Sequence, residues 1–449
     1  MIHKKILGIA ILTLLGTAIM IFCLPWKKSK SHLDTVQEKM DLRVELGYNT
    51  ALSAAYLDNS STQFLHSGNN INEDSPFEIA SITKSFTAHL AVILHREGKV
   101  DLFKNVDVVD LPITLYDLLT FSSGIRDPGP SKYFNPETGN TVPVADYTVK
   151  QAIQYCQETG LGYPPGTKQE YSNLSYAIAA LELERASNEP FEKLLRDKIL
   201  LPLKMDKTGF HIPPIQGTAY GVKAPPWKLK ELSGFSGLVS CASDLAKYLR
   251  YLFLTDEDET LSQDKALLLA LIPKLKHPYP NMQNALGWIL ETSFEDQIFG
   301  QTGRSLGFSC YIGYSRKQHK AAILLTNANT NDNLGRYILN ERYPLLTMKK
   351  SLLVEDSDLK RYEGKYSCKV NEEMIHSFVS SKDNKLFIVF DREAPIPLFP
   401  EKKNLFFPKS FDNYDESIAF QEDEDGKITG FEVLKKEQPC GVFKRLYEH

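Results

Sequence analysis

Two residues one helical turn apart, Ser81 and Lys84, have the types and spacing of a nucleophile and its base. Residues three apart share one face of a helix, so in a helical segment the Lys84 amine can reach the Ser81 hydroxyl. A base beside a serine activates the hydroxyl for attack on a carbonyl carbon. The pair therefore predicts covalent catalysis through Ser81.

The surroundings of this pair separate it from two other matches to the same spacing, Ser262-Gln263-Asp264-Lys265 and Ser357-Asp358-Leu359-Lys360. Those two occur in polar, acidic stretches, whereas Ser81 and Lys84 lie in a largely apolar stretch from Phe77 to Ile93. A lysine amine has an ordinary pKa of about 10.4, and burial or a nearby cation is needed to make it neutral at pH 7. We expect a buried helix here; the alternative is an ordinary helix start with a solvated amine.

A second motif, Tyr171-Ser172-Asn173, follows the turn-rich segment Tyr163–Thr167 and precedes the apolar run Leu174–Leu183. The same Y-x-N pattern also occurs at 133–135 and 279–281, so the motif alone is weak. A loop-borne tyrosine beside a helix start is well placed to face a cleft.

A third motif, Gly300-Gln301-Thr302-Gly303-Arg304, begins a glycine-punctuated stretch that continues through Gly307. Glycines in a strand permit another backbone to approach closely. We expect a strand whose edge a substrate backbone can approach.

Ser81, Tyr171 and Thr302 occur in the order and at the wide spacing that resemble the serine β-lactamase and penicillin-binding-protein superfamily. The resemblance is closest to the class C β-lactamase-like branch, with its esterases and D-alanyl-D-alanine carboxypeptidases. It extends over about residues 50–346 and includes further family-like segments at 118–125, 165–173, 201–208 and 234–245.

The resemblance implies a role for each motif residue. Ser81 would form an acyl-enzyme with an ester or amide, while Lys84 and Tyr171 share proton transfer, with the acylation base left open between them. Thr302 and Gly303 would line the opposite wall. Asn173 would bind the amide side chain of the substrate.

Two departures from the family pattern bear on the substrate. Gln301 replaces the usual Lys or His, which removes a positive charge and argues against efficient β-lactam hydrolysis. Arg304 replaces a small residue, and its guanidinium either restores the missing charge or faces solvent. By the same resemblance, the backbone N–H groups of Ser81 and Arg304 would form the oxyanion hole. The missing charge also motivates a rival hypothesis, a catalytically retired peptidoglycan-binding or sensory module.

The composition limits the partners. The 449 residues carry a net charge of −4 and give no reason to expect nucleic acid. No H-E-x-x-H or C-x-x-C motif is present, so neither a metal nor another cofactor is expected. The expected partner is a small-molecule or peptide substrate, with peptidoglycan fragments among the candidates.

The first 30 residues predict a signal anchor. A basic head, Met1–Lys5, precedes the uncharged segment Ile6–Trp26, which is long enough to span a bilayer as a helix. We expect membrane attachment through this helix, or secretion if it is cleaved. The family resemblance implies a catalytic domain outside the cytoplasm, periplasmic or extracellular.

Residues 31–350 are predicted to form the hydrolase domain. Ser29–Met40 has the polar composition of a stalk; strands are expected at both ends, and helices between about 81 and 254. This order favours an α/β (α+β) fold with an antiparallel sheet flanked by helices and an α-rich lobe. A strand is expected at 285–291 and a closing helix at 333–346. The Gly/Pro-rich loop at 128–143 either overhangs the cleft or is a disordered surface excursion.

Residues 356–449 are predicted to form a small all-β barrel. Short alternating segments recur through this part, with Asp425-Gly426 typical of a hairpin turn. Leu359–Tyr366 resembles the opening of the lipocalin-like barrel often appended to this family. The apolar face is expected to be core, and Cys368 with Cys440 is the candidate disulfide.

Overall fold

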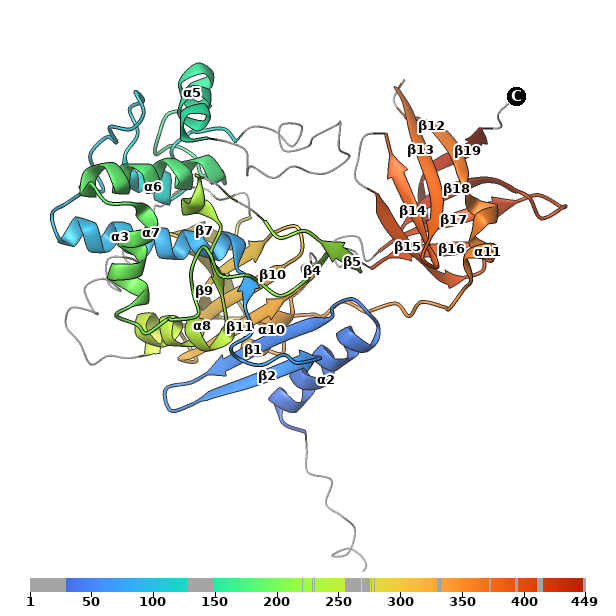
Figure 1. Ribbon diagram of the computed structural model, residues 1–449, viewed down its shortest axis with the longest axis horizontal. Helices are drawn as coiled ribbons and strands as arrows, with labels where there is room; N and C mark the ends of the chain where they lie inside the picture. The colour runs from blue at the N-terminus through green and yellow to red at the C-terminus, as the bar shows by residue number, and fades with distance from the viewer. Residues whose placement is uncertain are drawn as a thin grey trace, which may run out of the picture.

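A computed structural model describes residues 30–127, 148–219, 221–227, 229, 231–254, 268, 275, 277, 279–328, 333–370, 373–391, 395–409 and 415–446. The chain forms a mixed α/β body followed by a closed eight-stranded barrel (Figure 1). The predicted fold class is therefore confirmed. The proposed limits of 1–30, 31–350 and 356–449 remain predictions.

A seven-stranded antiparallel sheet forms the centre of the first body. Its spatial order is β2 (Thr62–Gly68), β1 (Ala51–Leu57), β11 (Lys320–Thr326), β10 (Ser309–Ser315), β9 (Asp296–Arg304), β8 (Ile289–Ser293) and β7 (Met282–Asn284). The expected strand at 285–291 begins later, because a tight turn containing Gly287 at φ 72° separates β7 from β8.

Alternating residues divide the sheet between two cores, because successive side chains in a strand point to opposite faces. In β11, Ile323 and Leu325 join the larger core under α8 (Ala242–Leu249). Ala322 and Leu324 join the smaller core under α2 (His32–Glu45) and α10 (Leu334–Leu339).

The expected polar stalk at Ser29–Met40 is wrong, since this stretch enters helix α2. Ser31 caps the helix through its hydroxyl, and Val36 and Met40, four residues apart, are fully buried on one face. Val44, one turn further on, also packs against this core. The expected helix at 333–346 is also shorter: it ends at Leu339, and the next residue, Asn340, has extended geometry at φ −151° and ψ 114°.

A helical lobe forms the rest of the first body. It contains α3 (Thr83–Arg96), α4 (Leu115–Leu119), α5 (Val149–Thr159), α6 (Asn173–Ser187) and α7 (Phe191–Leu195). Two two-stranded elements complete the body: β3 (Phe77–Glu78) pairs with β6 (Val239–Ser240), and β4 (Gly217–Ala219) forms a hairpin with β5 (Val222–Ala224).

After the short helix α11 (Asp356–Leu359), the eight strands of the barrel follow one another in sequence. They are β12 (Gly364–Val370), β13 (Glu373–Lys382), β14 (Lys385–Phe390), β15 (Ile396–Lys402), β16 (Leu405–Pro408), β17 (Glu416–Glu422), β18 (Ile428–Lys435) and β19 (Gln438–Leu446). Buried aromatic side chains, among them Tyr366, Phe420 and Phe431, fill the interior. The apolar face is therefore core, as predicted.

The candidate disulfide between Cys368 and Cys440 is wrong, because both cysteines are free. The register explains this, since Ser367 of β12 is opposite Lys444 of β19. Continuing that register places Cys440 about three residues, or roughly 10 Å, from the position opposite Cys368. Disulfides need Cα atoms within about 7 Å.

The barrel contacts the first body through a small buried cluster. Tyr48, Phe399 and Phe407 pack together, and the Lys409 ammonium donates to the Leu46 carbonyl at 2.8 Å. The ring of Phe399 also lies against Gly221, in the turn of the β4–β5 hairpin.

The predicted anchor Ile6–Trp26 and the predicted loop 128–143 lie outside the described residues. Within the ranges given above, no helix combines the length and the apolarity needed to cross a membrane.

Candidate active site

The residues that carry Ser81 form a tight turn at the start of α3. Ser81 lies in a 3₁₀ turn, Ala80–Ile82, and Lys84 lies in the first turn of α3. Ala80 has φ 43°, a left-handed conformation that costs a non-glycine residue about 1–3 kcal/mol and must be held by its surroundings. The pairing of β3 with β6, and a hydrogen bond from Ile79 N–H to the Leu238 carbonyl at 3.0 Å, hold it.

Three motif side chains meet at the Ser81 oxygen. The Ser81 Oγ lies 3.0 Å from Lys84 Nζ and 2.8 Å from Tyr171 Oη. Ninety residues of sequence separate Ser81 from Tyr171, so the tertiary fold creates this contact. The geometry permits a proton to move from the serine to either neighbour.

Lys84 is fully buried, and its amine has three oxygen neighbours. Besides Ser81 Oγ, these are Asn173 Oδ1 at 2.8 Å and the Phe235 carbonyl oxygen at 2.9 Å. Burial lowers the pKa of Lys84 to about 7, although the negative charge of Asp127 acts in the opposite direction. A neutral amine has two N–H groups and one lone pair. With Asn173 and Phe235 accepting the N–H groups, the lone pair faces the Ser81 hydroxyl.

Tyr171 lies in the loop before α6, as predicted, and its ring stacks on Phe121 at a centroid distance of 4.7 Å. The residue is 48% exposed, yet the burial around its hydroxyl raises the pKa of Tyr171 well above its usual value. At neutral pH the phenol therefore retains its proton and can donate it.

Asp127 positions this group and was missed by the sequence analysis. Its carboxylate accepts hydrogen bonds from Ser172 Oγ at 2.7 Å and from the backbone N–H groups of Asn173 and Leu174 at 2.8 and 3.1 Å. A carboxylate at a helix N-terminus is favourable. Asp127 thus fixes the start of α6 and with it Asn173, which contacts Lys84. Its only sequence signal is an acidic residue just before Pro128, far from the helix it caps.

The Phe235 carbonyl was also missed, because a backbone atom leaves no side-chain signature. The segment Ser233–Phe235 packs so closely on α6 that a Cβ at Gly234 would overlap Ala180. Thr87 of α3 donates to the Gly234 carbonyl at 2.6 Å. Helices α3 and α6 together hold the carbonyl against Lys84.

Strand β9 brings only part of its motif to the site. Thr302 is partly exposed, and Gly303 lies against the backbone of Ile79, where a Cβ would overlap the carbonyl oxygen. The glycine therefore permits close approach of the nucleophile turn of the protein, rather than only of a substrate. Pairing with β8 ends at Gly300, so residues 301–304 have no β8 partner.

Gln301 and Arg304 are placed differently. Gln301 is buried; its amide donates to the Gly287 carbonyl at 3.0 Å and accepts from Thr302 N–H. It holds the β7–β8 turn against α3, and none of its hydrogen bonds reaches Ser81, Lys84 or Tyr171. Arg304 is exposed at the end of β9.

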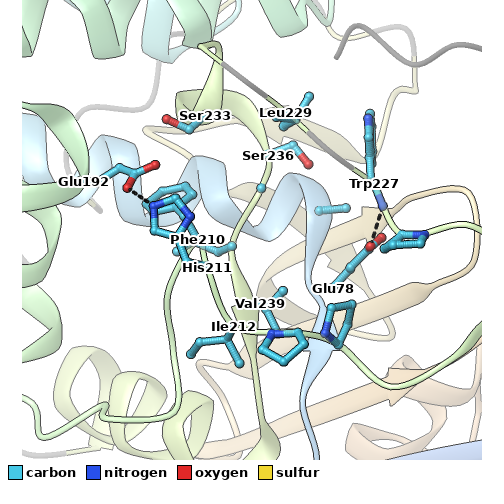
Figure 2. A pocket seen from close by; sticks show the side chains of 16 residues that line it. Glu78, Glu192, Phe210, His211, Ile212, Trp227, Leu229, Ser233, Ser236 and Val239 are labelled. Carbon is cyan, nitrogen blue, oxygen red and sulfur yellow. Dashed lines mark hydrogen bonds and ion pairs between the residues drawn. The ribbon is translucent and has the colours of Figure 1, made fainter. Parts of the chain in front are cut away.

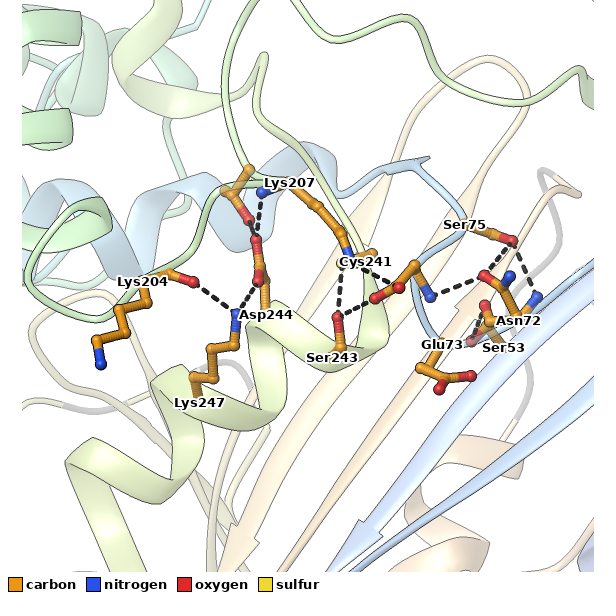
Figure 3. A network of polar contacts seen from close by, with 12 residues as sticks. Ser53, Asn72, Glu73, Ser75, Lys204, Lys207, Cys241, Ser243, Asp244 and Lys247 are labelled. Carbon is orange, nitrogen blue, oxygen red and sulfur yellow. Dashed lines mark hydrogen bonds and ion pairs between the residues drawn. The ribbon is translucent and has the colours of Figure 1, made fainter.

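A polar network anchors the segment that leads into β3 (Figure 3). Asp74 accepts from Ser243 Oγ at 2.7 Å and pairs with the Lys207 ammonium at 2.5 Å. The fully buried Asp244 accepts from Thr208 Oγ1 at 2.9 Å. These contacts tie the segment before the nucleophile turn to α8.

A family model described as "Beta-lactamase" matches residues 41–341. "Penicillin-binding protein 4*" of Bacillus subtilis (strain 168) is 23% identical over 378 residues, covering 75% of this chain and 81% of that protein. "D-alanyl-D-alanine-carboxypeptidase/endopeptidase AmpH" of Escherichia coli (strain K12) is 24% identical, covering 63% of this chain and 75% of that protein.

Two solved structures share the fold. The "octameric penicillin-binding protein homologue from Pyrococcus abyssi" aligns with a TM-score of 0.58 at 20% identity, covering 92% of this chain and 99% of that chain. The "Beta-Lactamase/D-Alanine Carboxypeptidase from Pseudomonas syringae" aligns with a TM-score of 0.57 at 21% identity, covering 70% of this chain and all of that chain.

Proposed function

Since the chain belongs to the β-lactamase family and is a serine hydrolase of that superfamily, we propose that it hydrolyses an ester or amide through an acyl-enzyme on Ser81. The observation that carries the proposal is the contact of one hydroxyl with two proton-transfer groups, Lys84 at 3.0 Å and Tyr171 at 2.8 Å.

Lys84 is the acylation base in this mechanism. The lowered pKa of Lys84, about 7, leaves a substantial neutral fraction at physiological pH, whereas the raised pKa of Tyr171 keeps its phenol protonated. As Ser81 Oγ bonds to the carbonyl carbon, its proton moves to Lys84 Nζ. Tyr171 donates its proton to the leaving group as the scissile bond breaks, and a proton from the Lys84 ammonium then returns to Tyr171 through water.

The oxyanion that forms during attack needs hydrogen-bond donors. We assign this role to the backbone N–H groups of Ser81 and Arg304, one on the nucleophile turn and one on β9. The absence of a β8 partner at residues 301–304 supports the assignment, because that edge of β9 can pair with a substrate backbone. The loss of one such donor typically lowers the rate by about 10²–10³.

The test is intact-mass analysis after treatment with a fluorophosphonate, alongside turnover of p-nitrophenyl acetate. We expect one covalent adduct in the wild type, none in Ser81→Ala, and ester turnover that needs Ser81. An adduct that persists in Ser81→Ala contradicts the proposal. Absence of both adduct and turnover favours the retired-module hypothesis instead.

A D-alanyl peptide is the second candidate substrate, favoured by the names of the relatives AmpH and the Pseudomonas syringae protein. The neutral Gln301, engaged with Gly287, offers no cation for a terminal carboxylate and favours a neutral ester instead. Release of D-alanine from a muropeptide, compared with ester turnover by the same preparation, decides between them.

We further propose that the catalytic domain lies outside the cytoplasm, attached to the membrane by Ile6–Trp26. The basis for the attachment is the uncharged length of that segment, and the basis for the location is the relationship to the β-lactamase family. Fractionation of cells that express the whole chain, with protease added from outside, tests this location. Recovery of protease-protected protein in the cytosol contradicts it.

A further inference from the structure

A cavity of about 390 Å³ lies between the nucleophile turn and the segment 210–239 (Figure 2). Ala80 lines it, whereas Ser81, Lys84 and Tyr171 do not. The residues that line the cavity are therefore different from those that meet at the reacting oxygen. A ligand held there would occupy a site of its own.

The walls of the cavity are mainly apolar. Side chains of Phe210, Ile212, Leu229, Leu238 and Val239 surround it. Its volume falls in the range of pockets that bind small molecules. An apolar group that enters the cavity would lose water-exposed surface, which is favourable.

Glu78 is a buried acid at one end of this cavity. The residue is 6% exposed, and its Oε1 accepts from the backbone N–H of Trp227 at 2.6 Å. Its other oxygen, Oε2, has no hydrogen-bond partner among the described residues, and the nearby Ser305 hydroxyl lacks the geometry of a hydrogen bond. Burial raises the pKa of Glu78, because the carboxylate loses contact with water. A cation in the cavity would offset that cost.

The cavity has no cation of its own for this carboxylate. Neither lysine nor arginine occurs among the described residues that line it. The one imidazole, that of His211, lies at the other end, where its Nε2 is 2.9 Å from Glu192 Oε2 (Figure 2). An anionic ligand would meet Glu78 without a compensating charge, so the cavity selects against anions.

Two further features of the walls suit an ammonium group. Ser236 is 1% exposed, and its hydroxyl has no hydrogen-bond partner within the described part of the chain, so it can accept from an N–H group. The aromatic rings of Phe210 and Trp227 also line the cavity, and the faces of such rings attract cations.

We propose that this cavity binds a cationic amine with an apolar body, at a site separate from the Ser81 chemistry. The ammonium group pairs with Glu78 Oε2, and the apolar body packs against Ile212, Leu229 and Val239. Because Glu78 lies in β3, which leads into the nucleophile turn, a bound amine adds a contact to that strand. The inference does not depend on the proposed hydrolysis.

The test compares benzylamine, benzyl alcohol and benzoate by calorimetry with the full chain at pH 7. The three probes share a ring and differ in charge. We expect the Kd of benzylamine to be about tenfold lower than that of benzyl alcohol, as for a hydrogen bond to a charged partner, and benzoate not to bind. Equal affinities for benzylamine and benzyl alcohol overturn the proposal, and so does the absence of benzylamine binding.

The same substitution at each end of the cavity identifies the acid. Glu78→Gln keeps an oxygen for the Trp227 N–H and removes the charge, so benzylamine should bind no more tightly than benzyl alcohol. Glu192→Gln, at the other end, is the matched control and should keep the tenfold preference. Thermal melting confirms that both variants are folded. A preference for the amine that survives in Glu78→Gln contradicts the assignment.

A second pair of variants locates the bound amine. Ile212→Trp fills the cavity and should weaken the binding of both benzylamine and benzyl alcohol. Tyr171→Ala opens the reactive group and should leave both affinities unchanged, because Tyr171 does not line the cavity. Loss of benzylamine binding in Tyr171→Ala, or full affinity in Ile212→Trp, would place the amine elsewhere and overturn the proposal. These are binding measurements, so they decide the question even for a chain that hydrolyses no ester.

Discussion

A comparison of two buried lysines, Lys84 in the reactive group and Lys409 at the contact with the barrel, shows that burial alone does not make a lysine a general base. Burial lowers the pKa of each, and each amine lies over an aromatic ring, Tyr171 at 4.8 Å and Phe399 at 4.3 Å. Lys409, however, donates to one acceptor among the described residues, the Leu46 carbonyl.

The difference lies in the partners of the amine. Lys84 meets two acceptors that bind its N–H groups and one hydroxyl that can give up a proton, which is the set a general base needs. Lys409 meets a carbonyl, which can only accept. Burial therefore makes the ammonium a stronger acid in both places, and only the arrangement around Lys84 can use the neutral amine that results.

The largest expected effect comes from making the same substitution at both sites. Lys84→Met should lower kcat/KM for p-nitrophenyl acetate by about 10²–10⁴, the usual contribution of a general base. Lys409→Met should leave it unchanged. Thermal melting of both variants controls for unfolding, and equal activity in the two variants would erase the distinction between the lysines.

The next effect tests the Tyr171 phenol, which contacts the same Ser81 hydroxyl as Lys84. Tyr171→Phe keeps the ring that stacks on Phe121 and removes the proton donor, so kcat should fall by about 10². Tyr163→Phe, in the same loop before α6, is the matched control and should leave kcat unchanged. A Tyr171→Phe enzyme with wild-type kcat would assign proton donation to another group.

A smaller effect concerns the charge beside Lys84. Asp127 raises the pKa of Lys84, so Asp127→Asn should shift the inflection of the pH–rate profile to lower pH. Ser172→Ala disturbs the start of the same helix without removing a charge and should leave the inflection in place. An upward shift in Asp127→Asn would contradict the electrostatic assignment.

The smallest effect on activity is expected at the barrel contact. Phe399→Ala removes the ring that packs with Tyr48 and Phe407, so the barrel should detach more readily from the first body. The chain at the exposed Leu353 should then be cleaved faster in limited proteolysis. Acetate turnover should stay unchanged. Phe431→Ala, inside the barrel, is the control for barrel instability, and loss of acetate turnover in Phe399→Ala alone would assign the barrel a catalytic role.

The parts predicted well from sequence are those encoded in side-chain type and spacing. Ser81 and Lys84 share a helical turn, Tyr171 precedes a helix start, and the alternating barrel strands follow from period-two patterning. These are local signals. The prediction that the distant motifs meet in one site came from the family resemblance.

The parts that were missed depend on backbone atoms and on contacts between distant segments. The Phe235 carbonyl is a backbone atom, which no residue type marks in the sequence. Asp127 caps a helix that begins 46 positions further along the chain. The Gln301 side chain hydrogen-bonds to the β7–β8 turn. Helix α2 does carry a sequence signal that was overlooked, because Ser31 and Asp34 form a capping box and Val36, Met40 and Val44 recur every four residues.

The pH dependence of Ser81 acylation tests the central claim most directly, because it reports the protonation state of Lys84. Single-turnover labelling by a fluorophosphonate, followed by intact mass, should accelerate as the pH rises through about 7 and then reach a plateau. A rate that keeps rising toward pH 10, as for a solvated lysine, would contradict the account.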